Sequence, residues 1–433
     1  MKSNALSFIR LGDIADFRNG LNFSKESHGK GCPLIGVGDF KDNFSPKWDE
    51  LEEINPDGVS KVEDYLKEGD LLFVRSNGNK ALVGRSLYIN KDIKALYSGF
   101  CIRARLKTDD ICPLFLAYFT KTQFFRDAIS FVAGTNINNL NQGILSEVRI
   151  PSYSKEKQAL IVKSLSSIDK KIELNNRINA ELEAMAKTLY DYWFVQFDFP
   201  DENGKPYKAS GGKMIYNHVL KRETPEDWKV NKLVEITSLI RRGISPKYTE
   251  ESGTQVLNQK CIRNQKISFE DSRRHQAIMD DDDERLLKPF DVLVNSTGVG
   301  TLGRVAYVKR LAEKKTTVDS HVSIVRANPD KVCPRYLAWK LMRYQPVIEA
   351  AANGSTGQVE LSKSFLEDLD VIIPSDSVAK KFSEFVEPIA ISVAKRESEN
   401  EQLISLRDWL LPMLMNGQVT VTPSTEPQEA QHG

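Results

Sequence analysis

An internal repeat limits the architecture of this chain more than any other feature of its sequence. LGDIADFRNG (residues 11–20) matches KLVEITSLIRRG (residues 232–243), and each segment ends in basic or polar residues and a glycine. LKEGDLLFVRSNG (66–78) matches LKPFDVLVNSTG (287–298) in the same order, roughly 220 residues further along. A duplicated chain predicts two related globular domains rather than one large domain.

Further matches extend the repeat to the end of each half. They are Gly84-Arg85 with Gly303-Arg304, Cys112-Pro113 with Cys333-Pro334, and the loop-to-strand segments 133–151 and 353–374, both ending at proline. The short apolar runs DLLFV, DVLVN and RVAYV predict strands, and residues 114–131 predict an amphipathic helix. We therefore expect each domain to belong to the α+β class.

A long helix is predicted after each of these prolines. Apolar residues recur at alternating spacings of three and four, which is typical of a coiled-coil seam. In the first helix (155–193) they are Ile161, Leu165, Ile168, Ile172, Ile178, Leu182, Met185 and Leu189. In the second (378–415) they are Phe382, Phe385, Val386, Ile389, Val393, Leu403, Leu406, Leu410 and Met413. About 40 helical residues span roughly 60 Å, and the two helices are expected to pair antiparallel.

The sequence therefore predicts two globular α+β domains separated by two long antiparallel coiled-coil-like helices, with an internal pseudo-two-fold repeat. Residues 196–227 are rich in Gly, Pro, Lys and Asn, which predicts an exposed linker or hairpin, and the end of the chain lacks an apolar pattern. The predicted boundaries are a first domain 1–152, a central helix 153–195, a linker 196–227, a second domain 228–375, a distal helix 376–420 and a disordered tail 421–433.

Composition excludes several classes of protein. The five cysteines lie far apart without a C-x-x-C pair, which argues against a disulfide framework or a zinc site and favours a reducing cytoplasm. The polar N-terminus does not resemble a signal peptide, and no run of about 18 apolar residues predicts a membrane span. The net charge of +1 leaves open whether basic residues are concentrated on one surface.

The motifs expected of an enzyme are missing or lie in the wrong context. GVGTLG (298–303) fits G-x-G-x-x-G, but the RVAYV that follows predicts a strand instead of the helix that a dinucleotide site needs. There is no G-x-x-x-x-G-K-[ST] phosphate loop and no His pair with metal-binding spacing. The acidic run 280–284 is more simply a solvated loop. We therefore expect no catalytic residues, no metal site and no cofactor in this chain.

The chain resembles the specificity (S) subunits of Type I restriction-modification systems along nearly its whole length. The resemblance rests on the order domain, helix, domain, helix, on NSTGVGTLGR (295–304), on the connector 197–214 that follows LYDYWF, and on LRDWLLPMLMNGQV (406–419). It implies that residues 1–152 and 228–375 are target-recognition domains, each reading one half-site of a bipartite, asymmetric DNA sequence. The helices would set the length of the unread spacer.

The resemblance also implies the partners. They are double-stranded DNA, two methyltransferase (M) subunits that bind S-adenosylmethionine, and two restriction/translocase (R) subunits that use ATP and Mg²⁺, with no membrane involved. Tyr190, Trp193, Phe194 and Trp409 are either core residues, which we favour, or docking positions for these subunits.

Candidate DNA contacts are the basic and amide- or hydroxyl-bearing residues in the matched loops, because such side chains contact phosphates and base edges. In the first domain they are Arg75, Ser76, Asn77, Asn79, Lys80, Arg85, Thr135, Asn136, Asn138, Asn139 and Gln142. In the second they are Arg241, Arg242, Gln259, Lys260, Arg263, Asn295, Ser296, Thr297, Thr301, Arg304, Ser355, Thr356 and Gln358. The same residue types also build turns, and His321 is equally compatible with a DNA contact or a structural role.

Two other functions remain open from the sequence. A coiled-coil scaffold that binds proteins would show no salt-sensitive DNA binding, whereas a DNA reader loses affinity steeply as salt rises. A self-contained restriction or modification enzyme would act without partners, and the missing motifs make it the least favoured alternative.

Overall fold

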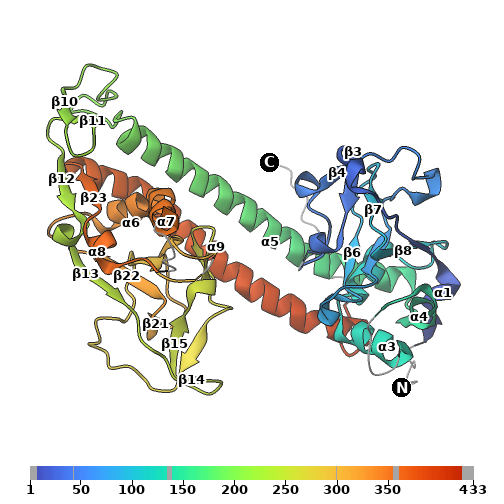
Figure 1. Ribbon diagram of the computed structural model, residues 1–433. Helices are drawn as coiled ribbons and strands as arrows, with labels where there is room; N and C mark the ends of the chain where they lie inside the picture. Colours follow the sequence, from blue (N-terminus) through green and yellow to red (C-terminus); the bar gives the residue numbers. More distant parts are fainter. Residues whose placement is uncertain (1–6, 42, 134–138, 299, 355–359, 422–433) are drawn as a thin grey trace, which may run out of the picture. The chain divides into compact units, whose positions relative to one another are not determined.

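The computed structural model describes residues 7–41, 43–133, 139–298, 300–354 and 360–421 of the chain. The chain divides into two compact units (Figure 1). The first contains residues 1–174 and 399–433, and the second contains residues 175–398.

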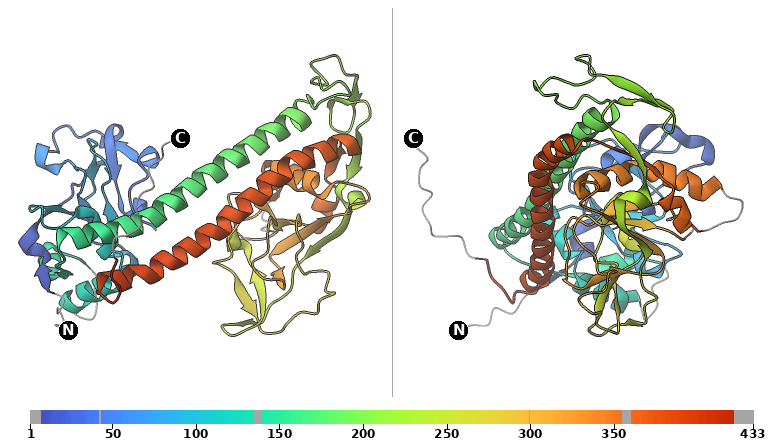
Figure 2. Two further views of the ribbon diagram at one scale, coloured as in Figure 1. Left: turned by 180° about the vertical axis from the view of Figure 1, so that it is seen from behind. Right: turned by 90° about the vertical axis from the view of Figure 1, so that its left-hand side faces the viewer.

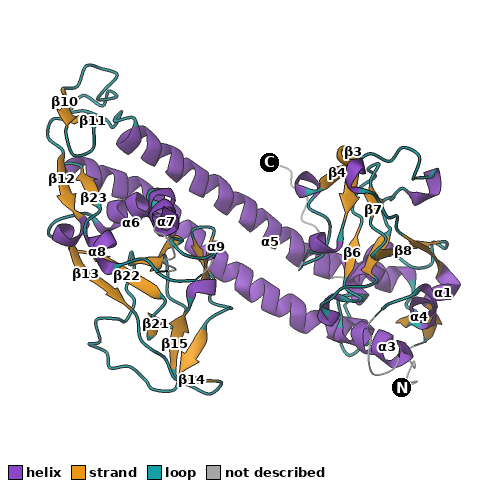
Figure 3. Ribbon diagram, in the orientation of Figure 1, coloured by secondary structure: helices purple, strands orange, loops and turns teal. Residues whose placement is uncertain are grey.

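The first unit contains mixed helices and strands (Figure 3). Its elements are β1 (Phe8–Arg10), α1 (Leu11–Ile14), β2 (Ala15–Asn19), β3 (His28–Ile35), β4 (Glu52–Ile54), β5 (Leu71–Val74), β6 (Ser86–Tyr88), β7 (Leu96–Tyr97), β8 (Cys101–Leu106), α2 (Pro113–Phe119), α3 (Gln123–Ala133), α4 (Gln142–Glu147), β9 (Arg149–Pro151) and the start of α5 (Lys155–Tyr190). Its antiparallel sheet has the order β2-β8-β5-β6, a smaller sheet has the order β4-β3-β7, and β1 pairs with β9.

The second unit repeats these sheets and adds two hairpins. Its elements are β10 (Met214–Asn217), β11 (Arg222–Pro225), β12 (Lys229–Lys232), β13 (Thr237–Arg242), β14 (Tyr248–Thr249), β15 (Thr254–Leu257), β16 (Ile262–Arg263), β17 (Lys266–Ile267), β18 (Arg273–His275), β19 (Val292–Asn295), β20 (Val305–Tyr307), β21 (Thr316–Val318), β22 (Val322–Ala327), α6 (Pro334–Arg343), α7 (Gln345–Gly354), α8 (Lys363–Glu367), β23 (Asp370–Ile373) and α9 (Asp376–Met415), which ends in the first unit. The order β13-β22-β19-β20 corresponds to β2-β8-β5-β6, β14-β18-β15-β21 contains the counterpart of the smaller sheet, and β12 pairs with β23 as β1 does with β9.

The repeat predicted from the sequence is thus confirmed as a repeat of topology. The apolar runs at 71–74 and 292–294 lie in β5 and β19, which are inner strands of their sheets and are buried on both faces. In β5, Leu71 and Phe73 pack with α2 and α3, while Leu72 and Val74 pack into a second cluster on the opposite face. Burial on both faces explains why these strands read as continuous apolar runs instead of alternating.

Residues 114–131 do not form one helix, so that expectation was wrong. The structure divides them into α2 and α3 because Thr120 and Thr122 interrupt the apolar pattern. The Thr122 hydroxyl accepts a hydrogen bond of 3.2 Å from the amide of Phe125 and so caps the second helix. Pro113 and Pro334 occupy the first turns of α2 and α6, where a missing amide hydrogen is tolerated.

The two long helices pack antiparallel within each unit. In the first unit, the beginning of α5 lies against the end of α9: Leu165 and Leu414 share a core, and Arg407 pairs with Asp169 at 3.0 Å. In the second unit, the end of α5 lies beside the beginning of α9 (Figure 2), where Tyr190 and Phe382 are 5.8 Å apart between ring centroids. A π-helical turn, Asp191–Val195, follows α5.

The aromatic residues at the helix ends divide between core and surface. Tyr190, Trp193 and Phe194 are buried in the core of the second unit, as the core interpretation predicts, whereas 57% of Trp409 is exposed. Among the described residues, none of the helices combines the length and apolar character needed to cross a bilayer.

Candidate nucleic-acid interface

In the second unit, several chain segments meet at an open concavity of about 1280 Å³. It lies where β13 and β19 end and includes the 3-10 turn Gln259–Cys261 and the start of α8. Its lining residues are Ser238, Leu239, Ile240, Arg241, Arg242, Gln259, Glu284, Thr297, Gly298, His321, Ser323, Glu360, Ser362 and Lys363. Four residues predicted from the sequence, Arg241, Arg242, Gln259 and Thr297, are therefore brought together.

The two arginines project from the end of β13, and each pairs with a carboxylate. Arg241 pairs with Glu284, and Arg242 pairs with Glu360 and also donates to the carbonyl of Leu361 at 3.1 Å. About half of the Arg241 side chain is exposed. Exposed ion pairs contribute only about 0–1 kcal/mol, so these guanidinium groups can exchange a carboxylate for a phosphate or a base edge.

Gln259, Thr297 and Thr301 form a polar cluster beside the arginines. The Thr301 hydroxyl donates to Oε1 of Gln259 at 3.2 Å, and the Thr297 hydroxyl shares a hydrogen bond of 2.7 Å with Nδ1 of His321. All three predicted residues are partly exposed. The amide of Gln259 and the hydroxyl of Thr297 line the concavity, where such groups can read base edges by hydrogen bonding.

Asn295 and Ser296 are completely buried, unlike their predicted neighbours. The Asn295 amide donates to the carbonyls of Gln259 (3.0 Å) and Thr301 (3.1 Å), and the Ser296 hydroxyl shares a hydrogen bond of 2.6 Å with Ser323. In this conformation both side chains support the loop that displays Thr297.

The remaining predicted residues of the second unit lie outside the concavity. Lys260 and Arg263 are exposed, the latter in the β16–β17 hairpin. Arg304 donates to the carbonyl of Gly300 at 2.8 Å, which fixes the glycine segment. That segment continues into strand β20, as the apolar run RVAYV predicts, and not into a helix.

In the first unit, the same strand ends bring a different set of side chains together. Arg75 follows β5, and its carbonyl accepts a hydrogen bond of 2.8 Å from the amide of Leu140. Gln142 donates to Asn19, at the end of β2, at 3.2 Å. The bond between Leu140 and Arg75 has a counterpart in the second unit, where the amide of Leu361 donates to the carbonyl of Ser296, also at 2.8 Å. Arg75, Ser76, Asn139 and Gln142 therefore belong to one region.

Asn77, Asn79, Lys80 and Arg85 lie in the loop and 3-10 turn after Ser76. Asn77 accepts from the amide of Asn79 at 2.8 Å, and Asn79 caps the turn by accepting from the amide of Ala81. The Arg85 guanidinium donates to the carbonyl of Lys41. These bonds are the turn-building roles that such residues often have. Thr135, Asn136, Asn138, Ser355, Thr356 and Gln358 lie outside the described residues.

Sequence reasoning missed several residues of this region. Asn19 occupies the strand position of Arg242, since Asn19 pairs with Ile102 as Arg242 pairs with Ser323. Glu284, Glu360 and Lys363 also line the concavity. Aligning the segments that end at Gly20 and Gly243 places Asn19 opposite Arg242 and would have identified it. No local sequence pattern marks Glu284 or Glu360 as residues of this region.

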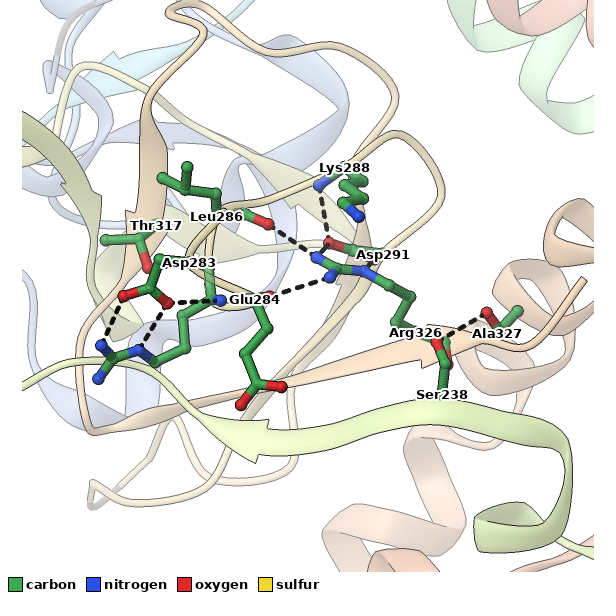
Figure 4. A network of polar contacts seen from close by, with 10 residues as sticks. Ser238, Asp283, Glu284, Leu286, Lys288, Asp291, Thr317, Arg326 and Ala327 are labelled. Carbon is green, nitrogen blue, oxygen red and sulfur yellow. Dashed lines mark hydrogen bonds and ion pairs between the residues drawn. The ribbon is translucent and has the colours of Figure 1, made fainter. Parts of the chain in front are cut away.

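A network of polar contacts around the buried Asp291 extends to Ser238 and Glu284, which line the concavity (Figure 4). The carboxylate of Asp291 accepts two hydrogen bonds from Arg326, at 2.8 and 2.6 Å, and only 1% of Asp291 is exposed. Arg326 also donates to the carbonyls of Glu284 (2.9 Å) and Leu286 (2.7 Å). Arg326 therefore holds the backbone of the loop that carries Glu284 toward Arg241.

Three carboxylates of the acidic segment 280–284 pair with basic side chains. Asp283 pairs with Arg285, which lowers the pKa of Asp283 to about 2, and Asp281 pairs with Lys315. In the described part of the chain, no three His, Cys, Asp or Glu side chains are grouped so that they could hold a metal ion. These contacts agree with the solvated-loop interpretation.

The repeated segments 11–20 and 232–243 each end in a glycine, and a close approach of two backbone segments explains why. Gly20 donates to the carbonyl of Cys101 (3.0 Å), and Gly243 donates to that of Val322 (3.1 Å). A Cβ atom at Gly243 would lie 1.9 Å from the carbonyl oxygen of Val318, and one at Gly20 would lie 2.1 Å from that of Ser98. Only glycine permits this approach of the two backbones.

Replacing Gly243 with alanine is expected to lower the free energy of unfolding by about 1–3 kcal/mol, because the added methyl group forces the two backbones apart. Gly38→Ala is the matched control, since nothing lies within 4 Å of its Cβ position. Urea denaturation of both variants measures the difference. Equal stability of the two variants would contradict this account of the turn.

Comparison with known proteins identifies relatives of the chain. A family model described as the Type I restriction modification DNA specificity domain matches residues 6–184. The Type I restriction enzyme MjaIX specificity subunit of Methanocaldococcus jannaschii is 24% identical over 320 residues, which cover 72% of this chain and 70% of that protein. The HindI specificity subunit of Haemophilus influenzae is 21% identical over 425 residues, covering 83% and 90%.

A solved structure shows the same fold. The S subunit of a Type-I restriction-modification system from M. genitalium matches with a TM-score of 0.56 at 15% identity, covering 96% of this chain and 98% of that one. The sequence relatives, the family model and this fold agree with one another. Over most of its length the chain is similar to the specificity subunits of Type I restriction-modification systems, and residues 6–184 match the specificity domain of that family.

Proposed function

We propose that this protein is the non-catalytic, DNA-reading subunit of a Type I restriction-modification complex and that it recognises a bipartite, asymmetric target. Residues 1–152 and 228–375 are the two target-recognition domains, and each reads one half-site. The helices 153–195 and 376–420 set the spacer between the half-sites, and residues 196–227 form the connection between the first helix and the second domain.

The observation that carries this proposal is a duplicated framework with different side chains. In the second unit, β13 and β19 end close together, and β13 carries Arg241 and Arg242 at its end. In the first unit, the equivalent strands β2 and β5 end close together, and β2 carries Arg18 and Asn19. The central strands are followed by Ser296 and Thr297 in one unit and by Arg75 and Ser76 in the other. Two domains with the same backbone but different side chains at the candidate DNA surface are suited to two different half-sites. Dimeric DNA-binding proteins, whose two subunits are identical, bind two identical half-sites.

Within this proposal, the candidate contacts have different roles. Arg241, Arg242, Gln259 and Thr297 line the concavity of the second unit, and Arg75, Asn139 and Gln142 hold the corresponding position in the first. Lys260 and Arg263 are exposed and suited to phosphates, whereas Asn295, Ser296, Thr301 and Arg304 support loops through their own hydrogen bonds.

The partners proposed are two methyltransferase subunits and two restriction subunits, which supply S-adenosylmethionine, ATP and Mg²⁺ chemistry. Trp409 and Leu406, on the part of α9 in the first unit, are 57% and 47% exposed. Exposed apolar and aromatic residues of this kind support a protein interface.

The test is co-expression with the methyltransferase and restriction subunits encoded beside this chain, followed by mapping of methylated adenines across the genome. We expect a bipartite motif that disappears when this chain is deleted. A stable complex that leaves no motif and binds DNA without salt dependence would overturn the proposal in favour of a protein scaffold.

A further inference from the structure

The turn that leads into the second strand of each main sheet is built in the same way in the two units. In the first unit the amide of Cys101 donates to the carbonyl of Ser98 at 2.9 Å, and in the second the amide of Val322 donates to that of Asp319 at 3.2 Å. The side chain of the first turn residue also accepts a backbone hydrogen: Ser98 from Phe100 (3.3 Å) and Asp319 from His321 (2.9 Å). Burial raises the pKa of this Asp319 carboxyl.

Phe100 and His321 occupy equivalent positions at the tips of these turns. The carbonyl of Phe100 accepts from the amide of Arg75 (2.7 Å), and that of His321 accepts from the amide of Ser296 (2.9 Å). Arg75 and Ser296 are themselves the first residues after β5 and β19. The backbone thus fixes both tips against the ends of the central strands.

Neither side chain is needed for the core. Phe100 is 58% exposed, and His321 is exposed and lines the concavity beside Arg242. A single exposed apolar residue is ordinary on a protein surface. Here, however, a hydrogen-bonded turn exposes the Phe100 ring next to Arg75. The equivalent residue of the second unit, His321, lines the concavity that is the candidate DNA surface.

We infer that positions 100 and 321 are equivalent base-contacting positions that distinguish the two half-sites, an inference that rests on the proposed function. Phe100 makes an apolar contact with the 5-methyl group of a thymine, which is the base-edge feature in the major groove that a hydrocarbon ring recognises. His321 is held through Nδ1 by Thr297, and among the described residues none occupies its Nε2, which hydrogen-bonds a base edge.

The first experiment removes the methyl group from the DNA. The complex with the methyltransferase subunits is titrated by fluorescence anisotropy with its mapped target, in which each thymine of one half-site is replaced singly by deoxyuridine. We expect one replacement to weaken binding about four-fold, the value for one buried methyl group. Phe100→Ala should weaken binding to the thymine duplex at least as much and lose the response to that replacement.

Two variants serve as controls. Phe100→Leu keeps an apolar side chain and should retain most of the response to the methyl group. His321→Ala should leave the response unchanged and instead relax one or two positions in the other half-site. Since both side chains are exposed, thermal melting should give the same Tm for all three variants and the wild type.

The outcomes separate this inference from the proposed function. If the wild-type complex methylates a bipartite motif but no thymine replacement depends on Phe100, the inference is overturned and the proposed function stands. If Phe100→Ala and His321→Ala relax the same half-site, the equivalence of the two positions is overturned. If the wild-type complex has no motif, the proposed function itself fails.

Discussion

Asp291→Ala is expected to lower the free energy of unfolding by about 3–5 kcal/mol, because the change leaves the Arg326 guanidinium buried without its carboxylate. Arg326 is only 14% exposed in its side chain, and Asp291 is 1% exposed. The carboxylate also accepts from the amide of Lys288 at 2.7 Å, so a backbone donor loses its partner too.

The control for this variant is an ion pair at the surface. Arg10 and Glu147 pair at 2.9 Å with side chains 48% and 51% exposed, and Glu147→Ala should cost less than about 1 kcal/mol. Urea denaturation gives both values, and hydrogen exchange should localise the effect of Asp291→Ala to the second unit. A cost similar to that of Glu147→Ala would show that the buried pair does not stabilise this unit.

The same arrangement exists in the first unit, which extends the prediction. Asp70 accepts from Arg105 at 2.7 and 2.6 Å and from the amide of Lys67 at 2.8 Å. Asp70→Ala should therefore destabilise the first unit to a similar degree, with loss of hydrogen-exchange protection there.

The combined variant Arg242→Ala, Gln259→Ala and Thr297→Ala is expected to reduce methylation at the natural target by about 10³-fold. Each side chain lines the concavity of the second unit, and each lost base contact typically costs about 1–3 kcal/mol. The loss should appear as degeneracy in one half-site of the methylation motif, while the other half-site keeps its sequence.

A matched control removes polar side chains elsewhere. Asn203, Lys205 and Lys208 are exposed residues of the connector, and their replacement with alanine should leave the motif unchanged. Genome-wide mapping of methylated adenines compares both variants with the wild type. Degeneracy in both half-sites of the combined variant would count against reading by separate units.

The sequence predicted the elements that local pattern determines. The continuous apolar run 292–294 indicates a buried strand, and the seam from Ile161 onward indicates a helix that the structure places at Lys155–Tyr190. The repeat predicted that both halves share one fold, which the equal strand orders confirm. These features follow from periodicity, which survives long after individual residues have diverged.

Features that depend on contacts distant in sequence could not be predicted. Ser296 appears in a loop-like sequence, yet it is buried because Ser323, on another strand, offers it a hydrogen bond. Phe100 resembles an ordinary strand residue, and only the turn held by Ser98 exposes it. Sequence reasoning selected polar residue types for the interface and therefore passed over an aromatic ring.

The turns at Phe100 and His321 have a consequence for how such a protein evolves. Their shape is maintained by main-chain hydrogen bonds, by the side chains of Ser98 and Asp319 and by glycines at 20 and 243, not by the side chain at the tip. A mutation at the tip can therefore be selected for a new target without first being filtered by its effect on folding. The phenylalanine at one tip and the histidine at the other differ in chemistry, although the turns that display them are built alike.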